Sequence, residues 1–370
     1  MYGVNSFYVW FFFIYVFFIL IVSAVFKGNS KGKIVLYALP LFLLSALRGD
    51  TVGGDLENYL PNFDAYYYLN RISDILGYSS HEPGYVLFAK LISLISPTHR
   101  FYIIVTSFCC LLGPFYLIYK YSRVPGLSVL MYYSLGFYTN TMNNIRQSLA
   151  ISICCFAVPF VLDKQFRKFI LLVIIATMFH YSAALFVFAF FLSIKEYTFK
   201  RFFLILGSGV GIYCLMGISL LQYVMTFAIF KYDPEALMDK PSSGWSLLVF
   251  YVILLVFEII VYVKQKNNLN EVAVNQYSAL IYFQLMAVLC QLYAPIYSSM
   301  TRASLYFYIP IVIAIPNFVK LFRRSRLLVS IIVFTLCFAY MCLFVYAYSD
   351  ETGSNSQGVI PYVLIDEKIF

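Results

Sequence analysis

The chain of 370 residues is 62% hydrophobic and 20% aromatic, and only 12% of its residues are charged. A soluble core cannot bury that much apolar surface, so the composition excludes a water-soluble globular protein and indicates a membrane protein. The formal net charge of +9 does not indicate nucleic-acid binding, because the basic residues lie in short loops between apolar runs, as in the cytoplasmic loops of membrane proteins.

Apolar runs of about 17 to 25 residues, the length that crosses a bilayer as a helix, recur along the sequence. We therefore predict an all-α, polytopic membrane protein that forms a single domain over residues 1–370. The first run begins near Phe7 with no basic segment before it, which favours a retained helix over a cleaved signal peptide. The ten full spans that we predict are 7–26, 33–47, 101–119, 126–140, 146–162, 201–221, 246–263, 276–294, 302–319 and 327–347.

Two further apolar stretches are predicted to be partial elements. Residues 85–95 are too few to span, and residues 168–194 are interrupted near His180. If the basic loops are cytoplasmic, the first stretch dips into the outer leaflet and the second is a re-entrant hairpin that turns near His180. If both stretches crossed the membrane fully, the protein would have twelve spanning helices. The bias of basic residues toward the cytoplasmic loops would then be lost in the middle of the chain. The predicted outer segments are the loop 48–84, a smaller loop 222–245 and the tail 348–370, with both termini outside.

Several kinds of site have no signature in the sequence. The eight cysteines lie in apolar runs without a C-x-x-C spacing, which favours packing residues over a disulfide framework or a zinc site. No G-x-G-x-x-G, P-loop, G-x-S-x-G or H-E-x-x-H motif occurs. We therefore expect no metal and no cofactor.

The segment 47–59 ends a hydrophobic run and concentrates one arginine, two aspartates, one glutamate and three glycines in a chain that is mostly apolar. This density of charge predicts one wall of a polar site at the mouth of a membrane cavity. Asp55 follows two glycines, where the backbone can turn sharply and approach a ligand, so its carboxylate is a candidate general base for a sugar hydroxyl. Alternatively, Asp50 and Asp55 pair with Arg48.

The predicted topology places most other unusual polar residues in the same outer layer. Three of them are arginines at helix ends, and an arginine fork binds phosphate bidentately. A helix N-terminus also prefers anions, which suits Arg146 and Arg302. Arg48 by itself could instead be an interfacial snorkelling residue, and Asn143 and Asn144 could simply cap a helix. The layer contains Arg48, Asp50, Asp55, Glu57, His81, Glu82, Asn143, Asn144, Arg146, His180 and Arg302.

Two more residues are candidate bases. Glu82 precedes Pro83, and it either caps the helix that begins there or accepts a proton from the substrate. His180 is as readily a hydrogen-bonded core histidine as a functional one, but it lies at the predicted break of a hairpin. A phosphate-bearing substrate reached from the outer leaflet fits these residues, and a polyprenyl-diphosphate-linked sugar is such a substrate.

In their order and spacing, these residues resemble the EpsG family of Wzy-type polysaccharide polymerases. The segment from Arg48 to Tyr59 is similar to the signature R-x-x-x-x-G-x-D-x-x-x-Y, with Gly54 in place of a small hydroxyl residue. The resemblance covers most of the chain. Its further matches are His81-Glu82-Pro83-Gly84-Tyr85, Asn144-Ile145-Arg146-Gln147, Phe179-His180-Tyr181-Ser182, Arg302 with Tyr306-Phe307, and Pro361-Tyr362.

The resemblance implies a polymerase of O-antigen, capsule or exopolysaccharide in the bacterial inner membrane, with a fold related to the GT-C glycosyltransferases and a site facing the periplasm. Such enzymes pass a growing chain from undecaprenyl diphosphate to a hydroxyl of a new lipid-linked repeat unit. A flippase and a chain-length regulator are candidate partners. By carry-over, the diphosphate ligands would be Arg48, Arg146 and Arg302, and the base or acceptor-positioning residues would be Asp55, Glu82 and His180. Other substrate contacts would come from Asp50, Tyr59, His81, Asn143, Asn144, Tyr181 and Tyr306.

Other functions remain open at this point. An O-antigen ligase, or another GT-C-like lipid-linked glycosyltransferase, would use the same kinds of residue. A polysaccharide flippase or transporter belongs to a different class. Transporters usually place ionisable residues near the midplane and show internal repeats, whereas here the charges gather at the outer edge and no repeat is visible.

Overall fold

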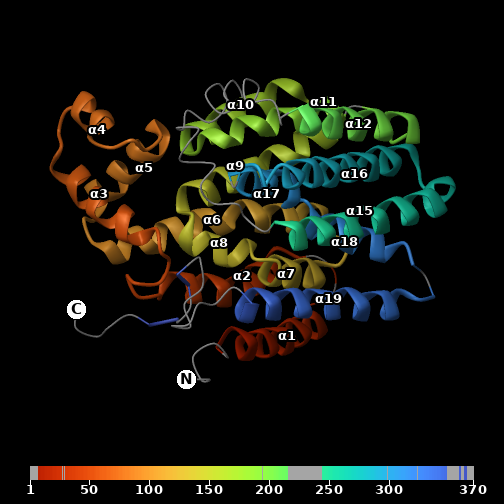
Figure 1. Ribbon diagram of the computed structural model, residues 1–370. Coiled ribbons are helices and arrows are strands. Elements are labelled where there is room, and N and C mark those ends of the chain that lie inside the picture. Colours follow the sequence, from red (N-terminus) through yellow and green to blue (C-terminus); the bar gives the residue numbers. More distant parts are fainter. Residues whose placement is uncertain are drawn as a thin grey trace. The chain divides into compact units, whose positions relative to one another are not determined.

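The computed structural model describes residues 7–26, 28, 30–193, 195–215, 244–297, 299–322, 324–347, 358–359 and 362–364. The predicted outer loop 222–245 and tail 348–370 lie largely outside the described residues. The described part is helical, and its β pairing is limited to one isolated bridge between Arg48 and Leu364 (Figure 1). The prediction of an all-α membrane fold is confirmed.

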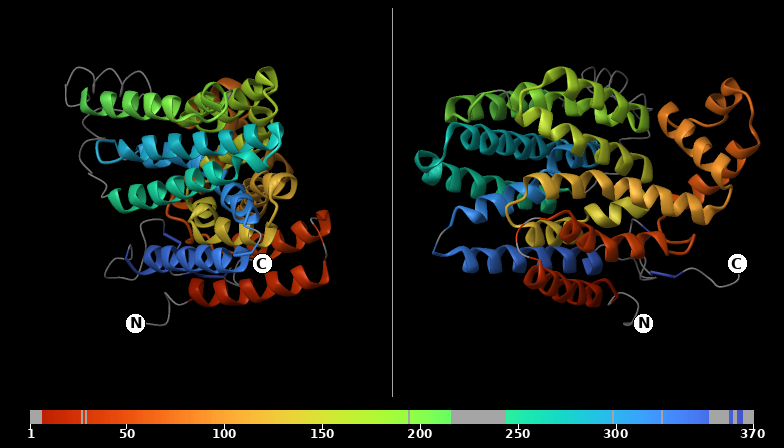
Figure 2. Two further views of the ribbon diagram at one scale, coloured as in Figure 1. Left: turned by 90° about the vertical axis from the view of Figure 1, so that its right-hand side faces the viewer. Right: turned by 180° about the vertical axis from the view of Figure 1, so that it is seen from behind.

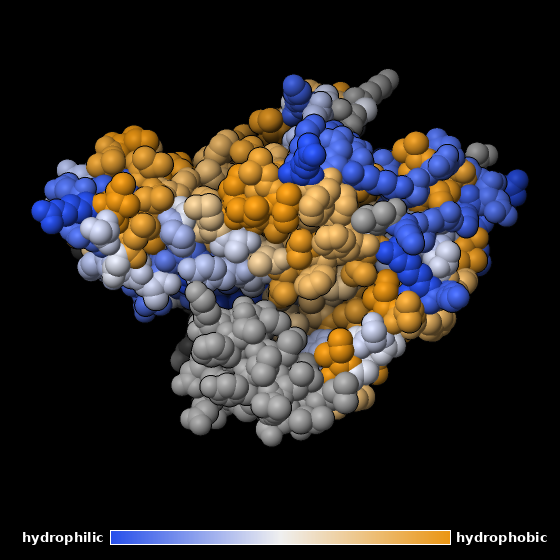
Figure 3. Space-filling model, turned by 90° about the horizontal axis from the view of Figure 1, so that it is seen from above, coloured by the Kyte–Doolittle hydropathy of each residue, from blue (hydrophilic) through white to orange (hydrophobic). Residues whose placement is uncertain are grey.

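Six described helices are long and apolar enough to cross a membrane. A seventh crossing results if the bent pair α17 and α18 is counted as one span. Hydrophobic side chains cover broad areas of the face shown in Figure 3, which is the surface expected of a protein that contacts lipid. The six helices are α1 (Phe7–Val25), α6 (His99–Tyr121), α9 (Ile145–Leu162), α15 (Trp245–Gln265, extended by the 3₁₀ turn Lys266–Asn268), α16 (Glu271–Leu292) and α19 (Arg326–Ala347).

The other four predicted spans are short or broken. Helix α2 (Lys31–Ala46) has 16 residues, and α12 (Phe199–Leu215) has 17 within the described part. The predicted span 126–140 divides at Gly136, whose φ of +82° suits glycine, into α7 (Pro125–Ser134) and α8 (Phe137–Asn143). The predicted span 302–319 bends by 42° between α17 (Ser299–Tyr308) and α18 (Ile311–Lys320), where Pro310 caps the second helix. The number of crossings therefore stays a prediction.

The predicted hairpin 168–194 folds back on itself as expected. Helix α10 (Phe166–Phe179) ends at His180, and the 3₁₀ helix η1 (Tyr181–Phe186) then leads into α11 (Val187–Ser193). The ring centroids of Phe166 and Phe190 lie 5.0 Å apart, so the start of α10 packs against α11. How deeply this hairpin enters the bilayer stays a prediction.

The predicted outer loop 48–84 contains two helices that were not predicted. Helix α3 (Leu56–Tyr68) begins directly after Asp55, and the short helix α4 (Ile72–Tyr78) follows it. The predicted partial element is α5 (Pro83–Ile95), which has proline in its first turn. Helices α3, α4 and α5 pack together as one arm (Figure 1).

The chain divides into two compact units. The first contains residues 1–152, 178–180 and 322–370, and the second contains residues 153–177 and 181–321. In the first unit, α19 lies beside α1 although the two come from opposite ends of the sequence (Figure 2). In the second unit, α16 packs against α11, α12, α15, α17 and α18.

A short C-terminal segment completes the first unit. This strap (residues 358–359 and 362–364) lies along the charged loop that follows α2. The N–H of Gly49 donates to the carbonyl of Val363 and the N–H of Gly53 to that of Gly358, each at 2.8 Å. The hydroxyl of Tyr362 donates to the carbonyl of Leu44 at 2.7 Å.

Helices α6 and α9 approach so closely that the side chain of Ser152 in α9 hydrogen-bonds to backbone groups of α6. The hydroxyl of Ser152 accepts from the N–H of Gly113 at 2.9 Å and donates to the carbonyl of Cys109 at 2.7 Å. It therefore bridges the two groups, Gly113 N–H and Cys109 carbonyl, that stand at positions i and i−4 of α6. A Cβ on Gly113 would lie 2.0 Å from the backbone oxygen of Ser152, so glycine is required for this contact.

We expect Gly113→Ala to destabilise the folded protein by about 1 to 3 kcal/mol or more, because the added methyl forces the two backbones apart. Thermal unfolding of the detergent-solubilised protein measures the effect. Gly207→Ala in α12 is the matched control, since nothing lies within 4 Å of the added Cβ, and alanine there should be neutral or favourable by up to about 1 kcal/mol. Equal unfolding temperatures for the two variants would contradict the contact.

Candidate active site

Arg48 is buried and its guanidinium bonds to neutral oxygens. Its side chain is only 1% exposed. It donates to the carbonyl and hydroxyl of Ser45 at 2.7 and 2.8 Å, and to the hydroxyl of Ser107 at 3.1 Å. It also donates to the carbonyls of Val52 at 3.1 Å and Met142 at 3.4 Å. Arg48 therefore joins α2, the following loop, α6 and α8.

Asp50 lies with a basic pair that sequence reasoning missed. His99 Nδ1 is 3.3 Å from the Asp50 carboxylate, and Arg100 Nη2 is 3.9 Å from it. His99 Nε2 lies 2.9 Å from Asp64. A usable signal was present, because Thr98 caps α6 and places these two basic residues, one of them an arginine, in its first turn. Positive charge is unfavourable there unless acidic partners compensate for it.

The glycines of the charged loop allow close contact with the protein backbone. Gly53 has φ of +108°, and a Cβ on it would lie 2.2 Å from the carbonyl oxygen of Met142. The N–H of Asp55 donates to Asn143 Oδ1 at 2.9 Å, which fixes the loop against the end of α8. The prediction that the glycines let this loop approach a ligand stays untested.

Asn143 and Asn144 have different partners. Asn143 accepts from the loop as just described, and Asn144 Nδ2 donates to Asn140 Oδ1 at 2.7 Å. The backbone carbonyl of Asn144 accepts the N–H of Ser148 at 2.9 Å, so Asn144 is the residue at which α9 begins. Both side chains hold α8 and its neighbours in place in this structure, and their contact with substrate stays a prediction.

Three of the predicted site residues form one charged group, which we call the Glu82 cluster: Glu82, Arg146 and His180. Arg146 Nη1 donates to Glu82 Oε2 at 2.5 Å, and His180 Nδ1 lies 3.6 Å from Glu82 Oε1. The Glu82 side chain is 4% exposed, whereas those of Arg146 and His180 are 24% and 17% exposed. The carboxylate is thus more enclosed than the guanidinium and the imidazole beside it.

The local backbone explains why these residues meet. Glu82 is the N-cap of α5, but its side chain makes no capping hydrogen bond, so the carboxylate is available to Arg146 and His180. Gly84 brings the start of α5 against the end of α10, because a Cβ there would lie 2.7 Å from Met178 Cβ and 2.8 Å from the Met178 carbonyl oxygen. Arg146 comes from the first turn of α9.

Tyr59 and His81 support the cluster. Arg146 Nε donates to the Tyr59 hydroxyl at 3.4 Å, and the guanidinium lies 5.7 Å from the centre of that ring. The His81 ring packs against Tyr59 and Tyr85, at centroid distances of 5.8 and 5.4 Å. Burial, and secondarily the charge of Arg146, lower the pKa of His81 to about 4. His81 is therefore neutral at pH 7 and adds no second cation.

The remaining predicted residues belong to the second unit. Arg302 is exposed in α17, whereas Tyr306 of the same helix is fully buried. The Tyr306 hydroxyl accepts from Ser182 Oγ at 3.2 Å. Tyr181 is 46% exposed at the start of η1. The predicted use of these residues in substrate binding stays a prediction.

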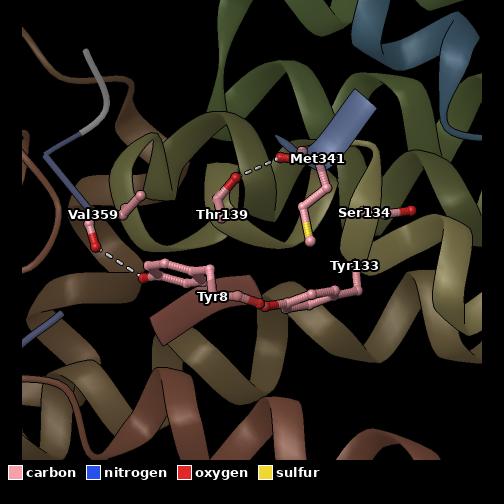
Figure 4. A pocket seen from close by; sticks show the side chains of 7 residues that line it. Tyr8, Tyr133, Ser134, Thr139, Met341 and Val359 are labelled. Carbon is pink, nitrogen blue, oxygen red and sulfur yellow. Dashed lines mark hydrogen bonds between the residues drawn. The ribbon is translucent and has the colours of Figure 1, made fainter. Parts of the chain in front are cut away.

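Two other features bear on the kind of site. Among the residues that the structure describes, no group of three or more His, Cys, Asp or Glu could hold a metal ion. A cavity of about 10 Å³ lies beside Tyr8, Thr139 and Val359 (Figure 4). That volume suits about one water molecule and excludes a sugar, so this cavity is not the substrate site.

The Glu82 cluster, its supporting aromatic residues and the strap all lie within one stretch recognised by a family model. The EpsG family model matches residues 33–364. The chain belongs to the EpsG family. No curated protein and no solved structure matches it. EpsG membership supports a membrane glycosyltransferase of the polysaccharide-polymerase type, as the resemblance implied.

We expect Gly84→Ala to lower polymer formation at least tenfold, because the methyl would push the start of α5 away from Met178 and separate Glu82 from His180. Polymer length and amount, normalised to protein level, measure the effect. Gly77→Ala in α4 is the matched control, since its Cβ would meet nothing within 4 Å. Wild-type polymer from Gly84→Ala would show that this close approach does not matter for the site.

Proposed function

We propose that this EpsG-family protein polymerises polyprenyl-diphosphate-linked oligosaccharide repeat units into O-antigen, capsule or exopolysaccharide at the outer face of the bacterial inner membrane. The Glu82 cluster carries the proposal. It combines a fixed cation, a buried carboxylate and a partly exposed imidazole in one place. Transfer of a sugar from a diphosphate carrier needs a cation for the leaving group and a base for the acceptor.

The proposed reaction is one displacement at the anomeric carbon of the growing chain. A hydroxyl oxygen of the new repeat unit forms a bond to that carbon. The bond from the carbon to the lipid diphosphate breaks, and its electron pair leaves with the diphosphate. The hydroxyl proton passes to a base on the protein. Negative charge grows on the leaving diphosphate, where a guanidinium fork stabilises it.

Arg146 is the best placed diphosphate ligand of the first unit. It stays charged at any physiological pH, and a quarter of its side chain is exposed. Arg48 is less suited to this task, because its guanidinium is enclosed by neutral oxygens of four segments. We propose that Arg48 shapes the site instead. Arg302, which is exposed in the second unit, remains the other candidate ligand.

His180 is the proposed base. Glu82 faces its Nδ1, which helps to hold the ring in one orientation, and 17% of the His180 side chain is exposed. Glu82 itself is more enclosed than His180 and already bonds to Arg146, so we propose that it positions both groups. Asp55 remains the alternative base, since it is partly exposed at the start of α3.

We expect Arg146→Ala, His180→Gln and Arg302→Ala each to lower the polymerisation rate by about 10²- to 10⁴-fold, the usual loss for a removed proton-transfer or charge-stabilising group. Export of repeat units and transfer of single units should continue. The measurement is extension of a defined lipid-linked repeat unit by the purified protein, together with the polymer ladder of whole cells. Glu57→Gln, an exposed carboxylate beside the site loop, is the control.

A ladder of normal length in all three variants, at normal protein level, would reject this site. Failure to export the repeat unit would support the transporter alternative. A purified protein that transfers a finished chain to a different acceptor, without extending it, would support an O-antigen ligase.

The proposed orientation has its own prediction. In a variant without native cysteines, Ser73→Cys in α4 should react with a membrane-impermeant thiol reagent in intact cells. Asn268→Cys, at the end of α15, should react only after lysis. Both positions are exposed in the structure, so labelling reports the side of the membrane rather than burial. The opposite pattern would place the Glu82 cluster on the cytoplasmic side.

A further inference from the structure

The second unit contains a buried carboxyl group that the proposed reaction does not use. Glu258 lies in α15 and is 0% exposed. Neither of its carboxyl oxygens has a hydrogen-bond partner among the described residues. Buried polar side chains normally have such partners, and an ionisable residue inside an apolar helix is costly, so Glu258 needs an explanation.

Glu258 lies too deep in its helix to reach water. The apolar helix runs from Trp245 to Asn268, which places Glu258 about 15 Å along the axis from the nearer end. A glutamate side chain is much shorter than that and cannot extend to the interface. The buried face that carries Glu258 also carries Leu255 and Tyr262. The carboxyl group is therefore held on an apolar and aromatic face.

No charged side chain of the described helices compensates for a negative charge at Glu258. Helix α15 packs against α16 and α18, and the ring of Tyr251 stacks on that of Tyr308 in α17 at a centroid distance of 3.9 Å. Lys266, in the 3₁₀ turn after α15, pairs with Glu196. The other charged residues of α15 to α18 are all exposed, and they are Lys264, Glu271, Arg302 and Lys320.

The other titratable residues of these helices cannot supply a positive charge. None of the four helices contains a histidine. Tyr262, one helical turn after Glu258, accepts from Ser278 Oγ at 3.1 Å and donates to Glu196 Oε1 at 3.4 Å. The rest are also tyrosines, with one cysteine, and they are Tyr251, Tyr277, Tyr282, Tyr306, Tyr308 and Cys290.

Among cations, the proton suits this position. A metal ion needs several oxygen or nitrogen ligands, and no group of three or more His, Cys, Asp or Glu in the described part of the chain could hold one. A carboxylate without partners in an apolar interior is very unfavourable. A proton removes that charge and needs no further ligand.

We propose that Glu258 is a proton-binding site inside the second unit, and that the bound proton keeps α15 packed against its neighbours. This role goes beyond polymerisation and does not depend on it, because it involves no substrate contact. If the proton left, the carboxylate would need water or a cation. Neither could reach it unless α15 moved away from α16.

The same face of α15 connects this site with α17. Tyr251 lies two helical turns before Glu258 on the buried face. Besides its stack on Tyr308, its hydroxyl lies 3.5 Å from Ser304 Oγ, and its carbonyl accepts from Gln284 Nε2 at 3.0 Å. Loss of the proton would therefore loosen the contacts of α15 with both α16 and α17.

Infrared spectroscopy of the full-length protein in nanodiscs tests the protonation. The spectrum of the wild type minus that of Glu258→Gln, both at pH 7, should contain the C=O stretching band of an un-ionised carboxylic acid. Glutamate labelled with carbon-13 should shift that band. Glu271→Gln, which removes an exposed carboxyl group of α16, is the control and should remove carboxylate bands only. Carboxylate bands alone in the Glu258 difference spectrum would overturn the proposal.

Unfolding by a denaturing detergent at several pH values tests the packing role. The folded wild type keeps a proton that the unfolded chain gives up to water, so unfolding releases this proton and stability falls as the pH rises. From about pH 6 to 8, the ratio of unfolded to folded protein should rise about tenfold more per pH unit in the wild type than in Glu258→Gln. Glu258→Met, which is apolar and of similar size, should match Glu258→Gln and replaces it if that variant does not fold. The same pH dependence in the wild type and the variants would overturn the proposal.

Discussion

The arrangement of the first unit depends on the hydrogen bonds that the buried side chain of Arg48 needs. An arginine without partners in an apolar interior is very unfavourable, so the chain must supply oxygen atoms around it. Arg48 obtains them from α2, from the loop after α2, from α6 and from α8. Since α8 leads directly into α9, the contact of Arg48 with α8 also helps to fix the position of Arg146. Lysine could not reproduce this contact, because it lacks the planar fork of donors.

The general fold could be predicted because hydrophobic length and loop charge are local signals. All ten predicted spans contain a helix, and the break at His180 was expected from three polar or aromatic residues in an apolar run. The break between α7 and α8 was not expected, although Gly136 was visible. A single glycine in an apolar run is compatible with a continuous helix, and the left-handed backbone of Gly136 that ends α7 is seen only in the structure.

The individual candidate residues were easier to predict than which of them lie together in the folded protein. Glu82, Arg146 and His180 were all candidates, but their pairing depends on Gly84 meeting Met178, a contact between α5 and α10 that no local pattern reveals. Arg48 was expected to bind phosphate, which stays a prediction, and the structure shows its guanidinium bonded to protein oxygens. For Asp50, the alternative of pairing with Arg48 was considered, yet its basic neighbours are His99 and Arg100, which the sequence analysis did not single out.

The strap has a consequence for how the protein is made. Tyr362 bonds to the carbonyl of Leu44 across 318 residues of sequence, and Val363 and Gly358 pair with the loop that contains the signature glycines. A ribosome synthesises the loop before the strap. Until residue 364 has emerged, the backbone N–H groups of Gly49 and Gly53 lack the partners that they have in the finished structure. The charged loop is therefore completed by a segment that is made much later, and a nascent chain passes through a stage in which this loop is not yet paired with the strap.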